Sequence, residues 1–508
     1  MNLRMDETLV TFLREVRQAA PDQKVYLVGG AVRDLVLGRG VKDLDFVVAD
    51  GSVQLAKAVR RRFKGVWYTL DDEHQTARVI LKQGQPGELI LDFTAFIGGS
   101  LEEDLRQRDF SINAMAIDLD NLSMAIDPLG GQDDLISGNL RLCNPQSLHS
   151  DPLRTIRAVR MTRTYNLDTG LEIINELRVA SKSLYRISGE RIRDELLKCL
   201  AMPDLALTYV LLKEYGILDQ LLYRIFKPES SNQFLEENFV ENSSDIDEFF
   251  EEDHLPTRQV LGKETKVERN FLKTLETLML HIESENPDSI IPERCPVCLS
   301  IPDILQGLNL FLRETLQGGR TRKQLLILFA MFFSDLSFHP SYDPESSPLG
   351  CLEFAERFTN TFMLGQKEHQ FYEAVCIGYR NIFSLHQETK VDALQIYRYF
   401  KQVGSCGVVS ALMHIVNYCA STSTMEEKKS LVEAIIFTWF REQATIVDPP
   451  RYVDGDDLQK ILHLNPGPDL GFYLESIREA QVEGKVKNRD EALALVSQLV
   501  KEGKYHDR

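Results

Sequence analysis

Two glycines near the amino terminus occupy a position suited to binding a phosphate group. A β-rich run, Val25–Val28, leads into Gly29 and Gly30, and a helical pattern containing Arg33 follows. Glycines let backbone N–H groups approach an anion closely, and a helix N-terminus favours negative charge. The turn therefore fits a triphosphate, although two glycines taken alone are more often a plain turn.

Three carboxylates follow where strands are expected. Asp43 and Asp45 flank the start of the run Leu44–Val48, and alternation along a strand places both on one face. Asp92 lies in the apolar run Leu89–Phe93, where an unpaired charge costs free energy. Because neighbouring carboxylates repel unless a cation compensates, the trio suits two magnesium ions that activate a hydroxyl and hold a triphosphate. An isolated Asp-x-Asp pair is more often a solvated strand end.

The elements that must position these residues form a mixed domain followed by helices. Between residue 25 and about residue 140 the β-rich runs are Val25–Val28, Leu44–Val48, Ala77–Leu81 and Leu89–Phe93. From Asp151 onward the apolar residues recur with helical spacing, and the last helices are expected near 470–480 and 489–501. The predicted fold class is α+β, with a small mixed-sheet head followed by an all-α remainder.

Composition is that of a soluble protein of several domains. The chain has 508 residues, a formal net charge of −18 and 43% hydrophobic residues. No apolar run has the length of a signal peptide or a membrane span, so we expect a cytoplasmic protein without a membrane partner. The negative net charge, taken alone, argues against a nucleic-acid partner. However, acidic residues concentrate in residues 228–256, and we expect this segment to be a solvated insertion or linker.

The eight cysteines lack the regular spacing of a disulfide framework, so we expect reduced thiols in helical cores. Only Cys295 and Cys298 form a Cys-x-x-Cys pair. A zinc site needs a second pair or histidines at ligand spacing, so we interpret this pair as a turn with two incidental thiols. No oligomeric state follows from the sequence.

The ordered motifs resemble the bacterial-type (class II) tRNA nucleotidyltransferases, which add C, C and A to tRNA 3′ ends, and the related bacterial poly(A) polymerases. The likeness covers residues 25 to about 200 and returns at Pro466-Gly467-Pro468. Its motifs are Gly29-Gly30-x-Val32-Arg33-Asp34, Asp43-Leu44-Asp45, Leu105–Ala116, Asp127–Leu135, Asp151–Arg154 and Ile187–Leu196.

This resemblance implies a role for most of the candidate residues. The aspartates matching Asp43 and Asp45 bind the catalytic metals in the family, so we expect Mg2+ there and count Asp92 as the third catalytic carboxylate. The expected nucleotide-binding residues are Gly29, Gly30, Arg33, Arg108, Asp109, Asn113, Asp151, Arg154 and Arg157.

Asp151 and Arg154 resemble the family's amino-acid template, in which an aspartate and an arginine three residues apart read the Watson–Crick edge of the incoming base. A carboxylate accepts from an exocyclic amine, and a guanidinium donates to ring acceptors. On a helix this spacing places both side chains on one face. Without the other motifs, Asp151 would be interpreted as a helix N-cap.

Two departures from the family's pattern bear on base selection. Family members usually carry Glu immediately before the template aspartate, and here that position is Ser150. The segment from Phe96 to Asp104 is also shorter than the flexible loop of many CCA-adding members. A short loop here resembles the loop of the family members that add only the two cytidines. Complete CCA addition and CC addition therefore both remain open.

Basic residues around the template helix and the neck form a candidate RNA-binding face. Such a face can hold the phosphates of an acceptor stem, which proteins recognise mostly by shape. Some of these arginines are expected to pair with nearby acids instead. The candidates are Arg160, Arg163, Arg191 and Arg193.

The resemblance also implies a division of the chain. A polymerase-beta-like nucleotidyltransferase head is expected over residues 1–140, and a helical neck with nucleobase-selecting and RNA-binding motifs over 141–205. A helical body with the acidic insertion would follow over 206–350, and a helical tail for tRNA binding over 351–508.

The predicted activity is template-independent addition of C and/or A residues (CCA, or CC only) to the tRNA 3′ end from CTP and ATP, with release of pyrophosphate. A poly(A) polymerase is the nearest alternative, because the head motifs are shared. A catalytically inactive RNA-binding homologue is the other, and the intact aspartates argue against it.

Overall fold

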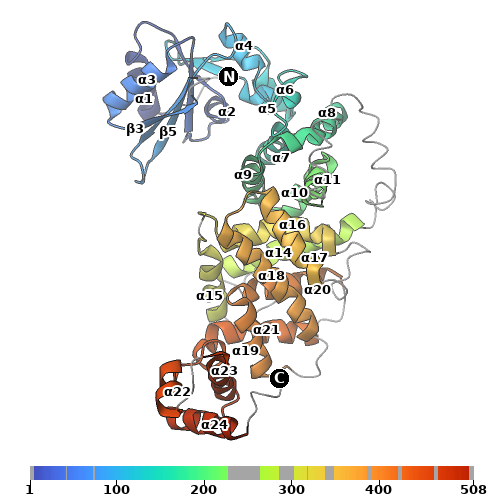
Figure 1. Ribbon diagram of the computed structural model, residues 1–508. Helices are drawn as coiled ribbons and strands as arrows, with labels where there is room; N and C mark the ends of the chain where they lie inside the picture. The colour runs from blue at the N-terminus through green and yellow to red at the C-terminus, as the bar shows by residue number, and fades with distance from the viewer. Residues whose placement is uncertain are drawn as a thin grey trace, which may run out of the picture. The chain divides into compact units, whose positions relative to one another are not determined.

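The computed structural model describes residues 5–41, 43–71, 75–226, 264–284, 302–316, 318–337, 348–385, 391–421, 426–462 and 467–502. The chain divides into two compact units. The first comprises Met1–Met202 and Leu211–Leu221, and the second comprises Pro203–Val210 and Leu222–Arg508. Each unit is described by itself (Figure 1).

The first unit is built on a seven-stranded mixed sheet with the order β3-β4-β5-β2-β1-β6-β7. The central strands β2 and β5 are parallel, and the other neighbours are antiparallel. The strands are β1 (Val25–Val28), β2 (Asp43–Val48), β3 (Val66–Asp71), β4 (Thr76–Leu81), β5 (Leu89–Ala95), β6 (Ala116–Asp118) and β7 (Ala125–Ile126).

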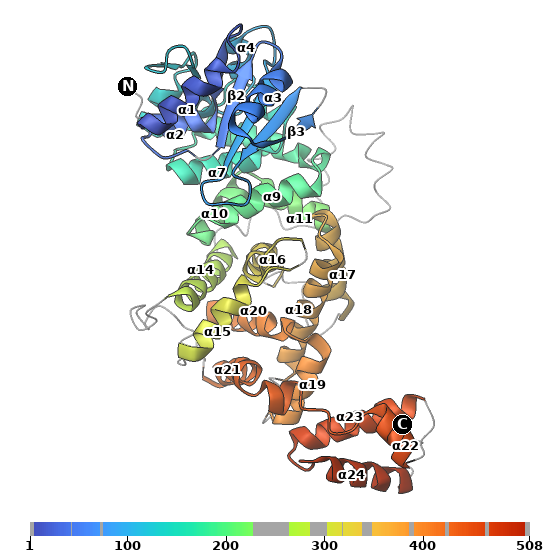
Figure 2. The ribbon, with the colours of Figure 1, turned by 90° about the vertical axis from the view of Figure 1, so that its left-hand side faces the viewer.

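One face of this sheet carries the main core of the unit. Helices α1 (Glu7–Gln18), α2 (Gly30–Val36) and α3 (Ser52–Phe63) cover it and bury aliphatic side chains against the strands (Figures 1 and 2). Phe46 of β2 and Phe93 of β5 stack there with ring centroids 5.1 Å apart. Burial of each such ring stabilises the fold by roughly 2–3 kcal/mol, which fixes the register of the two central strands.

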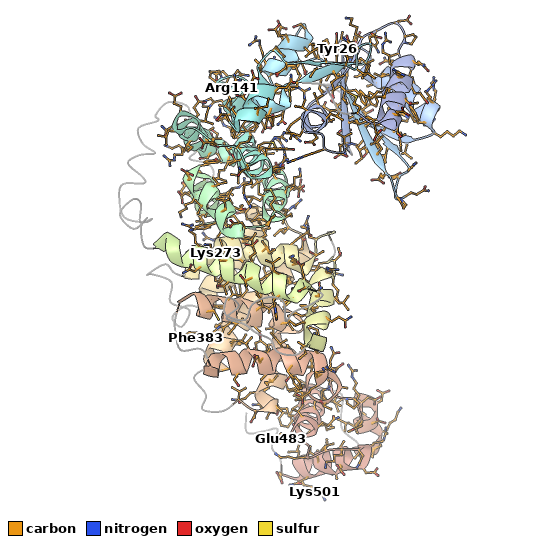
Figure 3. All side chains as sticks on the ribbon, turned by 180° about the vertical axis from the view of Figure 1, so that it is seen from behind. Tyr26, Arg141, Lys273, Phe383, Glu483 and Lys501 are labelled. Atoms are coloured by element: carbon orange, nitrogen blue, oxygen red, sulfur yellow. The ribbon has the colours of Figure 1, made fainter. Side chains whose placement is uncertain are left out.

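The opposite face has a smaller apolar cluster beside the polar residues of β2 and β5. Val28 and Val47 pack there against Leu105 of α4 (Leu101–Arg106). The chain then runs through η1 (Ser111–Asn113), β6, β7 and α5 (Gly131–Ser137). Arg141, labelled in Figure 3, donates to Asp134 of α5 at 2.7 Å and so attaches the following segment to this helix.

The remaining elements of the first unit are helical. They are α6 (Ser147–Ser150), α7 (Arg154–Tyr165), α8 (Leu171–Ser181), η2 (Lys182–Arg186) and α9 (Gly189–Leu200). Helices α7 and α9 pack against each other through apolar residues that include Ile156 and Leu196, both completely buried. The boundary between the two units falls in α10 (Leu205–Glu214) and α11 (Ile217–Phe226).

The described part of the second unit is helical, with an aromatic core. Phe329 lies 5.1 Å from Tyr372 and 5.7 Å from Phe358 between ring centroids. The elements are α14 (Glu264–Glu283), α15 (Pro302–Arg313), α16 (Arg322–Ser337), α17 (Pro348–Thr361), α18 (Gln366–Leu385), α19 (Ala393–Val403), α20 (Cys406–Ser421), α21 (Glu426–Arg441), the π-helix η6 (Gln443–Val447), α22 (Gly455–Leu462), α23 (Pro468–Val482) and α24 (Arg489–Lys501).

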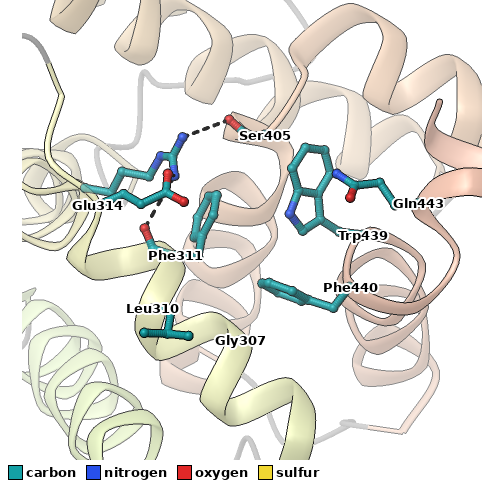
Figure 4. A pocket seen from close by; sticks show the side chains of 9 residues that line it. Gly307, Leu310, Phe311, Glu314, Ser405, Trp439, Phe440 and Gln443 are labelled. Carbon is teal, nitrogen blue, oxygen red and sulfur yellow. Dashed lines mark hydrogen bonds and ion pairs between the residues drawn. The ribbon is translucent and has the colours of Figure 1, made fainter.

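An open pocket of about 290 Å³ lies among α15, α16, α21 and η6 (Figure 4). Phe311, Trp439 and Phe440 form its aromatic walls. The Arg322 guanidinium lies 4.1 Å from the centroid of the Phe311 ring and donates to Ser405 Oγ at 3.3 Å. The pocket is aromatic and polar, and its only carboxylate, Glu314, is paired with Arg322.

The structure bears out the predicted fold class and the four strand runs, and it adds the six-residue strand β3 and the short strands β6 and β7. Cys143, Cys199, Cys376, Cys406 and Cys419 form no disulfide bond, and Cys143 lies outside the helices. Within the described ranges no helix is both long enough and apolar enough to cross a membrane. The acidic segment 228–256 and the pair Cys295 and Cys298 lie outside the described residues, and the four-part domain division remains a proposal.

Candidate active site

Strand alternation and parallel pairing bring the three predicted carboxylates to one face of the sheet. Leu44, Phe46 and Val48 are buried in the core, so Asp43 and Asp45 project to the other face. Asp45 is directly opposite Asp92 of β5 in the parallel register. Asp43 is exposed, whereas Asp45 and Asp92 are half-buried. The predicted same-face arrangement is therefore observed.

Asp45 lies in an environment that disfavours its charged form. Burial raises the pKa of Asp45 above its ordinary value of 3.8, and the charges of Asp92 and Asp43 raise it further, whereas Arg108 and Arg78 oppose the rise. A carboxylate whose charged form is disfavoured in this way is stabilised by a nearby cation. The position thus has the electrostatics of a cation site.

Asp92 already has a partner within the protein. Arg78 of β4 donates from Nε and Nη2 to the two Asp92 carboxylate oxygens at 2.7 and 2.8 Å. This bidentate pair is the geometry that a guanidinium and a carboxylate prefer. Asp92 thus shares the face with Asp45, and both of its oxygens are engaged by Arg78.

The glycine turn lies beside these carboxylates. Gly29 has a φ of 71°, in the left-handed region that side chains rarely adopt, and α2 begins at Gly30. A Cβ atom at Gly29 would stand 3.2 Å from Arg108 Nη1 and 3.3 Å from Asp45 Oδ2. Gly29 therefore keeps open the space where the turn, Asp45 and Arg108 converge.

Arg108 is oriented by a buried acid that the sequence reasoning missed. Its Nε and Nη2 donate to Asp104 Oδ2 at 3.2 and 3.0 Å, and Asp104 is only 3% exposed. The other Asp104 oxygen accepts the Ile97 backbone N–H at 3.0 Å. The four-residue spacing of Asp104 and Arg108 was the available signal, although Arg108 lies just beyond the end of α4.

Four residues predicted to contact the nucleotide bond to one another. Asn113 accepts from Arg33 and donates to Asp109 Oδ1 at 3.0 Å. Arg157 donates to Asp109 Oδ2 at 2.9 and 2.6 Å. Arg33, Asn113 and Asp109 are each at most 7% exposed. They form an internal network, and their contact with nucleotide stays a prediction.

The same network joins α2 to α7. The Arg33 guanidinium lies 4.3 Å from the centroid of the Tyr165 ring, a cation–π contact. The Tyr165 hydroxyl donates to Asp34 Oδ1 at 3.0 Å, and Asp34 in turn pairs with Arg33. Tyr165 was absent from the predicted site, since a lone tyrosine at the end of a helix gives no sequence signal.

Asp151 and Arg154 do not share a helix, so that part of the prediction is wrong. Helix α7 begins at Arg154, and Asp151 has an extended conformation with φ −144° and ψ 94°. Pro152 explains the difference, because the residue before a proline is disfavoured in helical conformation. Asp151 Oδ1 accepts from the Leu153 N–H at 3.3 Å, and Asp151 does not act as the N-cap of α7.

Ion pairs to acids are made by Arg160, Arg191 and Arg193 among the predicted RNA-binding arginines. Arg160 lies 2.5 Å from Glu195, Arg191 lies 2.9 Å from Asp151, and Arg193 is 8% exposed and bonds to Asp194 at 2.8 Å. Arg163 is partly buried on α7. Contact of the four predicted arginines with RNA remains a prediction. Of Arg160, Arg191 and Arg193, Arg191 has the most exposed side chain.

The chain is an enzyme of the nucleotidyltransferase class, and its mixed sheet presents two strand aspartates beside a glycine turn. Residues 25–141 match the family of the poly(A) polymerase head domain. Residues 172–230 match the probable RNA and SrmB binding site of polymerase A, and residues 366–496 match tRNA nucleotidyltransferase domain 2. Models of poly(A) polymerase and tRNA nucleotidyltransferase domains thus match three separate parts of this chain.

Individual relatives agree with this assignment. The CC-adding tRNA nucleotidyltransferase of Synechocystis sp. is 25% identical over 502 residues, which cover 97% of this chain and 99% of the relative. The CC-adding tRNA nucleotidyltransferase of Geobacter sulfurreducens is 38% identical over 186 residues, 37% of this chain and 42% of the relative.

Solved structures have the same fold. A CCA-adding enzyme in its apo form has a TM-score of 0.62 and 20% identity, with 97% of this chain and 95% of the other covered. The complex of a CCA-adding enzyme with CTP has a TM-score of 0.62 and 19% identity, with 98% and 96% covered.

Nucleotidyltransferases of this family generally use divalent metal ions. The residues of the site fit such an ion, because Asp45 is a half-buried carboxylate with a raised pKa and Asp43 shares its face. In the part of the chain that the structure describes, no group of three or more His, Cys, Asp or Glu side chains forms a complete ligand set. Two carboxylates are nevertheless enough for magnesium, which usually completes its coordination with water and substrate phosphates.

Proposed function

We propose that this enzyme extends the 3′ end of tRNA by adding C and/or A residues from CTP and ATP, with release of pyrophosphate. The observation that carries the proposal is the convergence of Asp45, the Gly29 turn and Arg108 on one face of the sheet. A tRNA acceptor is supported by the tRNA nucleotidyltransferase relatives and by the matched domain over residues 366–496.

Addition of the two cytidines alone is the subtype that we favour. The relative matched over 97% of this chain is a CC-adding enzyme. Only residues 96–100 separate β5 from α4, which fits the short loop expected from the sequence. Addition of the complete CCA sequence is the alternative within the same activity.

Each residue of the site then has a defined task. Asp43 and Asp45 would hold Mg2+, which supplies charge neutralisation and activates the attacking hydroxyl when bound. The tRNA 3′-hydroxyl attacks the α-phosphate, and pyrophosphate leaves without a covalent enzyme intermediate. The Gly29 turn and the outer Nη1 of Arg108 offer N–H donors to the triphosphate. Asp151 and Arg154 would read the base, and catalysis is positioning plus charge stabilisation.

The experiment uses the full-length protein and tRNA trimmed of its last three nucleotides. CTP alone, ATP alone and both together are offered, and the products are resolved at single-nucleotide length. Two additions with CTP and none further with ATP are expected for a CC-adding enzyme. A third addition with ATP identifies CCA addition, and long A tracts on generic RNA identify a poly(A) polymerase.

The matched variant carries Asp43→Ala with Asp45→Ala. Nucleotide incorporation should be lost in this variant. Its circular dichroism should stay unchanged, because both side chains point away from the buried core of the sheet. Retained incorporation in this variant would refute the proposed site. RNA binding by the wild type without any incorporation would identify a catalytically inactive homologue. A cytoplasmic location follows from the proposed substrate and is part of this proposal.

A further inference from the structure

Arg154 is fixed through a single nitrogen atom by a serine that no motif singled out. Its Nη1 donates to Ser147 Oγ at 2.8 Å, to the Ser147 carbonyl at 3.1 Å and to the Arg108 carbonyl at 3.2 Å. Ser147 is 1% exposed, so its hydroxyl is withdrawn from solvent. The contact is a charge-assisted hydrogen bond in a buried setting, which is stronger than a neutral one at the surface.

Ser147 is itself held by the segment that carries Arg108. Its hydroxyl lies 3.1 Å from the carbonyl oxygens of both Arg108 and Asp109, and its single proton is directed between them. The hydroxyl therefore donates to this segment and accepts from Arg154 at the same time. Ser147 thus connects the base-reading arginine to the backbone of the residue that faces the Gly29 turn.

No carboxylate bonds to Arg154 among the described residues. Ser150, at the position before Asp151, is exposed, and its hydroxyl donates to the Ser147 carbonyl at 2.9 Å. The partners of Arg154 are thus neutral, and its positive charge is uncompensated by a direct ion pair. Asp151 is paired separately, with Arg191 at 2.9 Å.

This arrangement leaves one edge of the guanidinium for a ligand. Nη1 of Arg154 is saturated by three acceptors, whereas Nε and Nη2 bond to no group in the described ranges. Those two nitrogens present a pair of parallel N–H donors. Cytosine offers two adjacent acceptors, N3 and O2, whereas adenine offers N1 beside a C–H group.

We propose that Ser147 is a positioning residue that fixes Arg154 so that its free edge selects cytosine over adenine. The proposal rests on the proposed function, because it concerns how that site chooses between CTP and ATP. Asp151 accepts the exocyclic amine that both bases carry, so it does not discriminate between them. Selection then depends on the orientation of Arg154, which the Ser147 hydroxyl sets.

The test compares Ser147→Ala with Ser181→Ala in the full-length enzyme. Ser181 is also 1% exposed and its hydroxyl also lies near two backbone carbonyls, those of Arg178 and Gly216, but it makes no contact with Arg154. Both variants lose a similar buried hydrogen bond, so a general loss of stability affects both. The measured quantity is the ratio of kcat/KM for CTP to kcat/KM for ATP on tRNA transcripts ending at the discriminator base.

Ser147→Ala should reduce this ratio by about tenfold or more, the scale of a hydrogen bond to a charged group, mainly through a higher KM for CTP. Ser181→Ala should leave the ratio within about twofold. Equal ratios in the two variants would overturn the proposal. Loss of all incorporation by the wild type would instead contradict the proposed function, so the two failures are distinct.

A second variant keeps the test decisive if Ser147→Ala does not fold. Ser150→Glu places a carboxylate at an exposed position directly before Asp151, where its negative charge attracts the nearby Arg154 guanidinium. This charge should draw the guanidinium away from Ser147 and lower the preference for CTP by about fivefold or more, as expected for one charged contact. An unchanged ratio in Ser150→Glu would by itself overturn the proposal.

Discussion

Asp45 on β2 lies directly opposite Asp92 on the parallel strand β5, and the Asp92 charge adds to burial in raising the pKa of Asp45. Arg78 donates to both carboxylate oxygens of Asp92, so the Asp92 carboxylate is paired with a guanidinium and remains opposite Asp45. The protein thus keeps Asp45 in an environment that favours a bound cation.

Asp45→Asn should stabilise the metal-free protein at neutral pH while removing activity. The folded-state pKa is raised, so the folded protein binds the proton more tightly than the unfolded chain, and the stability linked to Asp45 is lost as pH rises. Asparagine removes the charge that causes this loss. Nucleotide incorporation should fall by at least about a hundredfold, the scale of losing a charge-stabilising group.

Urea unfolding followed by tryptophan fluorescence measures this prediction. The protein has two tryptophans, and a Trp439→Phe background leaves Trp67 of β3 as a reporter for the sheet. Addition of Mg2+ should raise the midpoint of the Asp45 protein and leave that of Asp45→Asn nearly unchanged. A metal-free variant less stable than the parent would contradict the electrostatic argument.

Activity should decline on acidification at a higher pH than an ordinary aspartate would dictate. Metal binding requires the charged form of Asp45, whose pKa lies above 3.8 because of burial and the neighbouring Asp92. Higher Mg2+ competes with the proton and should move the acid limb to lower pH. The measurement is kcat/KM for CTP against pH at two Mg2+ concentrations; an acid limb that does not move with Mg2+ would count against Asp45 as a ligand.

Gly29→Ala should reduce activity far more than Gly84→Ala. The two glycines have φ values of 71° and 69°, so an alanine is strained at both, and more strongly at Gly29, whose ψ of −138° lies outside the left-handed helical region. A Cβ at Gly29 would approach Arg108 and Asp45, whereas at Gly84 it meets nothing within 4 Å. We expect a higher KM for CTP in Gly29→Ala alone. Similar kinetics in the two variants would mean that the turn does not border the nucleotide.

The sequence predicted the catalytic face better than the residues that support it. Strand alternation placed Asp43 and Asp45 correctly, because the period of two is set by the backbone itself. Asp104 and Ser147 were missed, since their importance depends on contacts with Arg108 and Arg154 that only the folded chain makes. Asn113, expected at the nucleotide from the family's second motif, bonds to Arg33 and Asp109 in the fold, and its contact with nucleotide stays a prediction.

The bond between Asp109 and Arg157 should contribute about 2–3 kcal/mol to the stability of the first unit. Burial acts to raise the pKa of Asp109, but Arg157, Asn113 and the Phe110 N–H outweigh it and hold this pKa below its ordinary value. In Asp109→Asn, the Arg157 guanidinium would face a neutral amide and lose its ion pair. Because the Arg157 side chain is 35% exposed, water compensates part of the lost free energy of unfolding.

The pH dependence separates this charge effect from a packing defect. Because the folded-state pKa of Asp109 is lowered, its contribution is present above the unfolded pKa of about 3.9 and is lost as pH falls through the folded value. The difference in unfolding free energy between parent and Asp109→Asn should be constant near neutral pH and shrink below about pH 4. Asp120→Asn is the matched control, because Asp120 is 47% exposed and pairs with Arg17 at the surface, so its loss should cost less than about 1 kcal/mol. Urea unfolding reported by Trp67 gives both differences, and an Asp109→Asn effect as small as that of Asp120→Asn would show that the buried bond does not stabilise the unit.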